Sequence, residues 1–378
     1  MMNQISYKIP DDDEAVSWAG DCPLTDWICM GTENGRVVMP VSQPANGLYD
    51  LACIVEGLGD VVNGVAFGER FAAVSTPSSI SFIRASIDAP EKLGEIVATI
   101  PSGAFDVVSV GRERFLAPMG IYGLMLASLD DSGRVHAETL GHGEYTTNFY
   151  MARLVETRST VTTVAVAGRH DGLIRLQLHE PGAPASVGIS TFHDIDVVDV
   201  CPFQWPGARH AVVGLGINGE LIVCDDLTHG KPVAVRIPHI AGRAYSLRRA
   251  GPHLVILTNE SVHVFEDFRS AGPLLAARKL QNQDIRIRSF QNPPSEIYVA
   301  KESLLITERD GTVYVDDVDA ILGAEASGKS ATCSQAGQTD DPRNGWLNPI
   351  DFSEVPQGIE NFARTTNTSL NCGPAVVA

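Results

Sequence analysis

The chain has 378 residues, of which 44% are apolar and 20% are charged, and its formal net charge is −18 at pH 7. This composition excludes a disordered chain and predicts a globular protein with a large core. The length fits either two or three ordinary domains or one closed all-β unit. The acidic balance argues against nucleic-acid binding, because that function needs lysines and arginines to neutralise phosphates.

Other local features narrow the class of protein further. No apolar run approaches the roughly 18 residues that a membrane-spanning helix needs. The N-terminal stretch "MMNQISYKIPDDDEAV" lacks the basic and apolar regions of a secretory signal. The seven cysteines form no paired framework and no zinc-ligand spacing, which favours buried, reduced thiols. We therefore expect a cytoplasmic protein that binds no membrane and no nucleic acid.

One group of arginines could form a local basic patch despite the acidic balance. Because charged groups of this kind are usually solvated or paired, we expect them to be salt-bridged or solvated in the wall of the molecule. The group consists of Arg243, Arg248, Arg249, Arg286 and Arg288.

Seven stretches share one pattern, an apolar run followed by a turn and a second apolar run. In chain order they are "DWICMGTENGRVVMPV", "RFAAVSTPSSISFIRAS", "RFLAPMGIYGLMLASLDD", "VAVAGRHDGLIRLQLHE", "HAVVGLGINGELIVCDD", "HLVILTNESVHVFEDF" and "SLLITERDGTVYVDDVD". The Asn-Gly and Asp-Gly pairs in several of them favour tight hairpin turns, which need positive φ angles. The turns fall near Gly35, Ser79, Gly123, Gly172, Gly219, Ser261 and Gly311, roughly 42–50 residues apart, the period of a four-stranded propeller blade.

Each hairpin is flanked by further strand-like runs, so that each unit has four strands. The runs that precede the hairpins are "VNGVAF", "AFDVVSV", "NFYMARLV", "IDVVDVC", "AYSLRRA" and "IRIRSF". The weaker, alternating runs that follow them as outer strands are "LACIVE", "GEIVATI", "VHAETL", "PVAVRI" and "LLAARKL". One such unit cannot bury both of its faces, whereas units stacked in a ring bury them and remove long open edges.

We therefore predict an all-β fold, a seven-bladed β-propeller with four-stranded blades over residues 1–323. The seventh hairpin lacks an outer strand, and we expect residues 4–9 to supply it and close the ring. The alternative is that "AILGAEA" supplies it or forms a short helix. Two β-sandwich domains would also show many short strands, but they would not produce a steady period over this length.

The repeats resemble those of the WD-repeat family. "DGLIRLQLHE" and "DGTVYVDDVD" are similar to the third strand of such repeats, which usually ends in Leu-Trp-Asp, although no unit here carries Trp-Asp. "LGHGEYTTNFYMA", which includes His142, resembles the Gly-His that opens a repeat. The resemblance implies a rigid platform for proteins or peptides, usually without catalysis.

The period stops after Leu322, and residues 324–378 form a C-terminal extension rich in small and polar residues. Spaced apolar residues favour an irregular tail packed on the propeller over a free, flexible one. They are Trp346, Leu347, Ile350, Phe352, Ile359 and Phe362. Deleting residues 325–378 should then lower the melting temperature, and an unchanged value would indicate a free tail.

In a propeller, the loops that join an outer strand to the next first strand lie on one face beside the central channel. These loops and the first residues after them contain the candidate binding residues: His142, Glu144, Tyr145, His193, Asp194, Asp196, His239, Arg243, Tyr245 and Asp284. His142, His193 and His239 fall at similar points of three successive units, so they are also candidate ligands for iron, zinc or manganese. The competing interpretation is that these histidines make hydrogen bonds inside their own blades.

Motifs for catalysis are missing from the sequence. We find no G-x-S-x-G elbow, no P-loop and no H-E-x-x-H pattern. "GLGING" has the spacing of a dinucleotide motif, but it lies between two strands rather than between a strand and a helix. No catalytic residue and no cofactor is therefore predicted.

These observations predict a non-enzymatic interaction platform that binds a protein or peptide partner on one face of rim loops. The protein could equally be the accessory subunit of an enzyme, which differs only in the identity of the partner. The alternative is an enzyme or small-molecule-binding propeller with a polar central-channel site, with or without a metal.

Overall fold

The computed structural model describes residues 5–7, 14–24, 27–40, 51–86, 92–140, 148–158, 160–179, 186–190, 195–203, 210–224, 226–227, 233–236, 243–259, 261–265, 286–289, 294–300, 303–308 and 313–317. The regular elements of these residues are β-strands, which form seven four-stranded antiparallel sheets. The described part of the chain contains no helix long and apolar enough to cross a membrane.

The first three sheets in chain order follow the same plan, with each strand hydrogen-bonded to the next. Blade 1 contains β2 (Val16–Cys22), β3 (Trp27–Thr32), β4 (Val37–Pro40) and β5 (Leu51–Val55). Blade 2 contains β6 (Gly64–Phe67), β7 (Phe71–Ser75), β8 (Ile80–Arg84) and β9 (Ile96–Ile100). Blade 3 contains β10 (Val108–Gly111), β11 (Arg114–Pro118), β12 (Leu124–Leu129) and β13 (Val135–Leu140).

The next three sheets repeat this order. Blade 4 contains β14 (Ala152–Arg158), β15 (Val161–Ala167), β16 (Leu173–His179) and β17 (Ser186–Ser190). Blade 5 contains β18 (Val197–Pro202), β19 (Val212–Gly216), β20 (Glu220–Cys224) and β21 (Val233–Arg236). Blade 6 contains β22 (Ala244–Ala250), β23 (His253–Thr258), β24 (Ser261–Phe265) and β25 (Arg286–Ser289).

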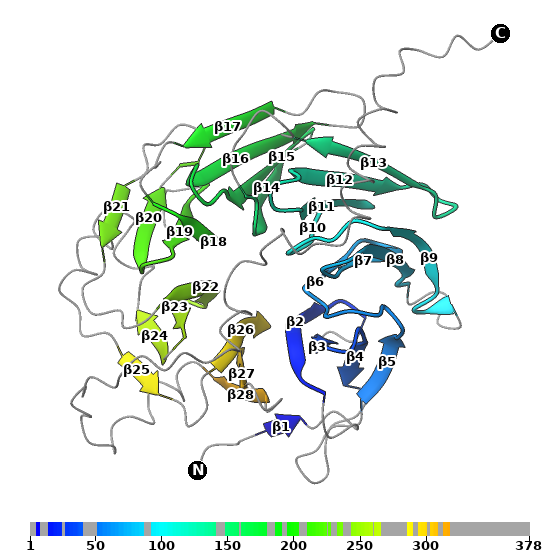
Figure 1. Ribbon diagram of the computed structural model, residues 1–378, viewed down its shortest axis with the longest axis horizontal. Helices are drawn as coiled ribbons and strands as arrows, with labels where there is room; N and C mark the ends of the chain where they lie inside the picture. Colours follow the sequence, from blue (N-terminus) through cyan, green and yellow to red (C-terminus); the bar gives the residue numbers. More distant parts are fainter. Residues whose placement is uncertain are drawn as a thin grey trace.

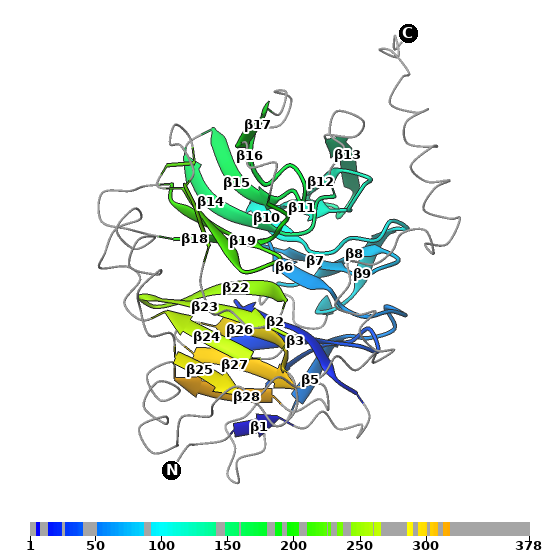
Figure 2. The same ribbon diagram turned by 60° about the vertical axis from the view of Figure 1, so that its left-hand side comes forward.

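The seventh sheet joins the two ends of the described chain. It contains β26 (Pro294–Ala300), β27 (Ser303–Glu308), β28 (Val313–Asp317) and, beside β28, the N-terminal strand β1 (Ile5–Tyr7). β1 pairs antiparallel with β28, with Ile5 opposite Val315 and Tyr7 opposite Val313. Both views show β1 at the outer edge of this sheet (Figures 1 and 2). The alternative strand, "AILGAEA", lies outside the described residues, as does the C-terminal extension.

The sheets are arranged around a common centre, with the first strand of each blade innermost (Figure 1). Each of these first strands contacts the first strand of the next blade, and β26 of blade 7 contacts β2 of blade 1. At that junction the Tyr298 hydroxyl donates a hydrogen bond to the Ser17 carbonyl oxygen at 2.6 Å, and the Tyr298 and Trp18 rings meet edge to face at 6.4 Å. The all-β propeller prediction is confirmed, and the two-sandwich alternative is excluded.

The strand assignment at the end of blade 6 needs a correction. The sequence pattern predicted "LLAARKL" (274–280) as the outer strand of blade 6 and "IRIRSF" (285–290) as the first strand of blade 7. Instead β25 pairs with β24, with Ser289 opposite Ser261, so it is the outer strand of blade 6. The first strand of blade 7 is β26, which pairs with β27. The alternating arginines and isoleucines of this segment suit an edge strand. The alternation alone does not tell the outer strand of blade 6 from the first strand of blade 7.

The same hydrogen-bond contact recurs where one blade meets the next. In each case the turn between the second and third strands of one blade bonds to the segment that enters the first strand of the following blade. The contacts are Val62 N to Thr32 O (3.0 Å), Ala104 N to Thr76 O (3.0 Å), Gly120 N to Phe149 O (3.0 Å), Arg169 N to Val197 O (3.1 Å) and Ala244 N to Ile217 O (3.1 Å). We call the side of the ring formed by these turns and segments the loop face.

Apolar clusters between neighbouring blades form the core. The middle strands read as nearly continuous apolar runs because both of their faces are buried between blades. Between blades 2 and 3, Phe82 and Phe115 are fully buried, with ring centroids 6.0 Å apart. Each cluster joins two blades, so the blades stabilise one another.

A buried histidine in blade 6 makes the stability of the fold depend on pH. His263 has no exposed surface, and its Nε2 lies 2.9 Å from Ser261 Oγ. Burial lowers its pKa to about 4. The unfolded chain, with a His pKa near 6.5, then binds the proton more readily than the folded chain does. Stability from neutral His263 is therefore complete above about pH 6.5 and is lost as the pH falls toward 4.

We expect this histidine alone to lower the free energy of unfolding by about 2 kcal/mol between pH 7 and pH 5. Urea unfolding of the wild type and of His263→Gln at both pH values measures the difference. The variant should lose less stability than the wild type on acidification. An equal loss in both proteins would contradict the assignment.

Candidate functional site

A group of aromatic and charged side chains gathers on the loop face where blades 3 to 6 meet. We call it the loop-face cluster. Its members are Phe105, Tyr150, Arg169, His170, Asp196 and Arg243. Four of them belong to segments that enter the first strands of successive blades, and Arg169 and His170 belong to the β15–β16 turn. The first strands that these four residues precede, β10, β14, β18 and β22, are the innermost strands of their blades (Figure 1).

Two aromatic rings and one guanidinium form the centre of the cluster. The ring centroids of Phe105 and Tyr150 lie 4.6 Å apart, and the Arg169 guanidinium carbon lies 5.3 Å from the Tyr150 ring centroid. An arginine over the face of a tyrosine gains a cation–π attraction. All three side chains are only partly buried, so they present an aromatic and cationic surface to solvent.

The backbone holds Arg169 in an unusual conformation. Its φ angle is +33°, and it is the only described non-glycine residue with a positive φ. The turn is held by the paired hydrogen bonds between Arg169 and Val197 and by Gly172 in the left-handed region at φ +74°. Strain of this kind persists only where the surrounding structure imposes it, and it is concentrated at functional sites.

Asp196 and Arg243 add opposite charges to the cluster. Asp196 Oδ1 lies 2.5 Å from His170 Nδ1. Burial lowers the pKa of Arg243, and the nearby Arg169 cation lowers it further, while Tyr150 and Asp196 oppose the shift. Burial raises the pKa of Tyr150, and Arg169 and Arg243 act against that rise.

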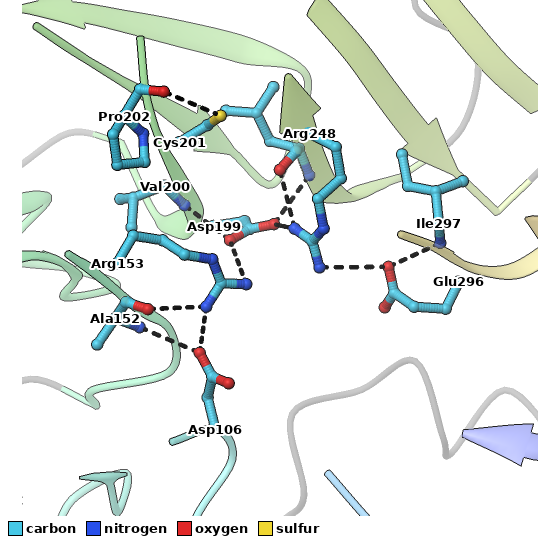
Figure 3. A network of polar contacts seen from close by, with 11 residues as sticks. Asp106, Ala152, Arg153, Asp199, Val200, Cys201, Pro202, Arg248, Glu296 and Ile297 are labelled. Atoms are coloured by element: carbon cyan, nitrogen blue, oxygen red, sulfur yellow. Dashed lines mark hydrogen bonds and ion pairs between the residues drawn. The ribbon is translucent and has the colours of Figure 1, made fainter. Parts of the chain in front are cut away.

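A chain of alternating charges links the first strands of blades 3 to 7. We call it the charge ladder, and it runs Asp106, Arg153, Asp199, Arg248, Glu296 (Figure 3). Arg153 Nη1 is paired with Asp106 Oδ2, and Arg153 Nη2 lies 3.8 Å from Asp199 Oδ1. Arg248 Nη1 lies 2.5 Å from Asp199 Oδ2, and Arg248 Nη2 lies 3.8 Å from Glu296 Oε1.

Backbone groups complete the ladder. Asp199 accepts hydrogen bonds from Val200 N and from Leu247 N of the next blade, both at 2.8 Å, and its side chain is fully buried. Arg248 Nη1 donates back to the Leu247 carbonyl at 2.8 Å. Burial alone would lower the pKa of Arg248, but the carboxylates of Asp199 and Glu296 outweigh it and raise that pKa. The ladder therefore ties blades 5 and 6 through both side chains and backbone.

Two of the acids in the ladder are poorly solvated. Burial raises the pKa of Asp106 and of Glu296, even though Arg153 and Arg248 respectively act in the opposite direction. Asp106 directly follows Phe105, so the ladder begins at the loop-face cluster. A buried, fully paired network of this kind makes the strands beneath the cluster rigid.

Of the sequence-predicted site residues, the structure brings Asp196 and Arg243 into the loop-face cluster. Tyr245 packs against the apolar cluster between blades 6 and 7. The remaining candidates lie outside the described residues: His142, Glu144, Tyr145, His193, Asp194, His239 and Asp284. In chain order Asp284 comes before β25, the outer strand of blade 6, and not between blades 6 and 7 as the sequence pattern had predicted.

The predicted metal ligands His142, His193 and His239 lie outside the described residues. Within the described ranges, no group of three or more His, Cys, Asp or Glu side chains is placed to hold a metal ion. Among the arginines expected to be paired in the wall, Arg248 belongs to the charge ladder and the Arg249 guanidinium lies 5.6 Å from the Phe203 ring centroid.

Sequence reasoning missed four members of the cluster, Phe105, Tyr150, Arg169 and His170, and it missed Arg153, Asp199 and Glu296 in the ladder. One signal for the ladder was present. Asp106 and Asp199 are 93 residues apart, Asp199 and Glu296 are 97 apart, and Arg153 and Arg248 are 95 apart. These spacings equal about two repeats, so acids and arginines alternate from blade to blade.

Comparisons with known proteins identify structures with the same fold. No protein-family model and no curated protein sequence matches the chain. The WD40 β-propeller domain of Doa1 superposes with a TM-score of 0.54 and 9% identity, over 80% of this chain and 96% of that domain. The β-propeller domain of Cps50 (Swd1) from Myceliophteria thermophila superposes with a TM-score of 0.56 and 7% identity, over 82% of this chain and 98% of that domain. The chain therefore has the fold of a WD-repeat-like β-propeller.

Proposed function

We propose that the protein is a non-enzymatic interaction platform that binds a protein or peptide partner on its loop face. The observation that carries the proposal is the loop-face cluster, in which partly exposed aromatic and cationic side chains lie together on one face of the propeller. Tyrosine and arginine are enriched among the residues that dominate binding energy at protein interfaces. The likeness to WD40 propellers supports a platform role by analogy of fold.

The support beneath the cluster favours binding without large rearrangement. The repeated turn-to-strand hydrogen bonds fix the backbone of Tyr150 and Arg169, and the charge ladder fixes the first strands. A pre-organised surface loses less conformational entropy when a partner binds. Such a surface suits a platform that presents one fixed set of contacts.

Co-purification from the cells that make this protein tests the proposal. The test variant is Tyr150→Ala with Arg243→Ala. The matched control is Arg112→Ala, which removes an exposed arginine from the β10–β11 turn on the opposite face. We expect the recovered amount of at least one co-purifying protein to fall about tenfold or more with the test variant and to stay unchanged with the control.

Each variant is first checked for the circular dichroism spectrum and melting temperature of the folded protein. Any protein that no longer co-purifies with the test variant is then purified, and its binding to the purified wild-type protein is measured directly. The proposal fails if all co-purifying proteins are retained equally by both variants, or if the control alone loses them.

The enzyme or small-molecule alternative predicts a different result. It rests on His142, His193 and His239 as ligands, and elemental analysis of the purified protein tests it directly. Stoichiometric iron, zinc or manganese that disappears in His142→Ala would favour that alternative.

A further inference from the structure

The outer strand of blade 2 differs from most outer strands in the side chains that it exposes. β9 has the sequence IVATI, without a charged residue, and its Ile96 side chain is 43% exposed. Among the described residues, Ile96 is the only exposed large apolar side chain on an outer strand. The outer strands β13, β21 and β25 contain charged residues instead. Charges of this kind protect an edge strand from pairing with another chain.

The other uncharged outer strands are less suited to pairing with a further strand. β1 has only three residues. β17 has a glycine, Gly188, at its centre, and glycine weakens a strand. β5 is approached by the segment before β9, because a Cβ atom on Gly94 would lie 1.6 Å from the Ile54 carbonyl oxygen. β9 is therefore the outer strand most open to another chain.

The outer edge of β9 has no strand beside it in the part of the chain that the structure describes. Its inner edge pairs with β8, where Ile100 lies opposite Ile80. In an antiparallel pair, alternate residues direct their N–H and C=O groups away from the partner strand. β9 lies at the outer edge of blade 2 in both views (Figures 1 and 2). It therefore presents backbone donors and acceptors that one more extended strand would satisfy.

The side chains of β9 hold the strand against its own blade. Val97, Ala98 and Ile100 pack on the apolar cluster between blades 2 and 3. Thr99 Oγ1 lies 3.2 Å from Ser81 Oγ on β8. Because the edge is already fixed in its extended conformation, a further strand that pairs with it orders only itself.

The sequence of β9 is nearly symmetric about Ala98. Ile96 and Ile100 flank Ala98 at equal spacing, and so do Val97 and Thr99, which are both β-branched. In an antiparallel pair of two β9 strands with a two-fold axis at Ala98, Ile96 lies opposite Ile100 of the other copy. Val97 then lies opposite Thr99 of the other copy. Such cross-strand pairs suit β-branched side chains, so the strand is complementary to itself.

The charges next to β9 do not oppose a second copy of this acidic protein. Each chain has a formal net charge of −18, so two copies repel unless their contact is locally neutral. Glu95, directly before β9, has its carboxylate 2.9 Å from Arg84 Nε, so this charge is compensated. Pro101, directly after β9, has no N–H group and ends the pairing edge. The contact therefore joins uncharged residues of the two copies.

We infer that two copies of the chain associate through antiparallel pairing of their β9 strands about a two-fold axis at Ala98. The two four-stranded sheets of blade 2 then form one continuous sheet across the dimer. The inference is independent of the proposed function, and such a dimer carries two loop faces. A contact of five residues per copy is small, so the dissociation constant should be micromolar, and the protein should be monomeric at the low concentrations of unfolding experiments.

Sedimentation velocity over about 1–200 µM protein tests the inference. The wild type should show a reversible equilibrium between monomer and dimer. Ile96→Lys places a charge on the pairing edge and should raise the dissociation constant about tenfold or more. Ile121→Lys is the matched control, because it makes the same change at an isoleucine that is 53% exposed in the β11–β12 turn. This control should associate like the wild type.

Two further variants test the antiparallel register. Ala98→Lys and Ala98→Glu each bring two like charges together at the axis, so each variant alone should associate more weakly than the wild type. An equimolar mixture brings lysine opposite glutamate and should associate more tightly than either variant alone. Circular dichroism and melting temperature first establish that each variant is folded.

Several results would overturn the inference. They are a wild type that stays monomeric over the whole range, equal association of Ile96→Lys and the wild type, weakened association of Ile121→Lys, and no gain when folded Ala98 variants are mixed. If the Ala98 variants do not fold, the comparison of Ile96→Lys with Ile121→Lys decides. The proposed function is tested separately by co-purification, because its variants change the loop face and leave β9 intact.

Discussion

Replacing Asp199 with alanine is expected to lower the free energy of unfolding by about 3–5 kcal/mol. The change removes one side of a buried ion pair and leaves Arg248 with its cation largely buried and only Glu296, at 3.8 Å, beside it. It also leaves Leu247 N without the acceptor that it has at 2.8 Å. Both losses fall between blades 5 and 6, so the ring is weakened at one junction. Guanidinium unfolding followed by circular dichroism measures the effect.

Two companion variants show whether the buried pair is responsible. Glu69→Ala removes a carboxylate from the exposed pair with Arg112, where the atoms lie 2.8 Å apart, and it should change stability little. The double variant Asp199→Ala/Arg248→Met should be more stable than Asp199→Ala alone, because it no longer leaves an uncompensated charge. If Asp199→Ala and Glu69→Ala have the same free energy of unfolding, the charge ladder does not stabilise the ring.

Truncating Phe115 to alanine should cost a similar amount, about 3–5 kcal/mol. The Phe115 ring is 1% exposed and packs 6.0 Å from the Phe82 ring, so that the cavity opens between blades 2 and 3. The apolar cluster around this cavity contains side chains of both blade 2 and blade 3, so neither blade alone can fill the cavity. Thermal and guanidinium unfolding report the loss.

Phe115→Leu should cost less, because it leaves a smaller cavity. Ile96→Ala is the surface control: its side chain is 43% exposed on the outer strand of blade 2, and the change should stay within about 0.5 kcal/mol. A Phe115→Ala protein as stable as Ile96→Ala would show that packing between blades 2 and 3 is loose.

The repeat could be predicted from the sequence because its signals are local. Hairpin turns need glycine at left-handed positions, and Gly172 and Gly219 occupy them at φ +74° and +83°. Middle strands are apolar on both faces because blades stack on both sides of them, so each appears in the sequence as a nearly continuous apolar run. Outer strands lack this constraint, which is why β25 was assigned to the wrong blade.

The site was harder to predict because its contacts cross between blades. Arg248 meets Asp199, a residue 49 positions earlier, through backbone and side-chain bonds that no local pattern encodes. Arg169 precedes an ordinary His-Asp-Gly turn, and nothing in those letters indicates its positive φ angle. Asp196 and Arg243 were found because both directly precede a first strand, which the repeat locates.

Hydrogen–deuterium exchange on the complex with a co-purified partner tests whether the loop face is the binding surface. Exchange in the loop-face turns 119–123, 168–172 and 216–219 should be slower when the partner is bound. Exchange in the opposite turns 111–114 and 250–253 should stay unchanged. Protection confined to those opposite turns, with the loop face exchanging as in the free protein, would show that the partner does not bind the loop face.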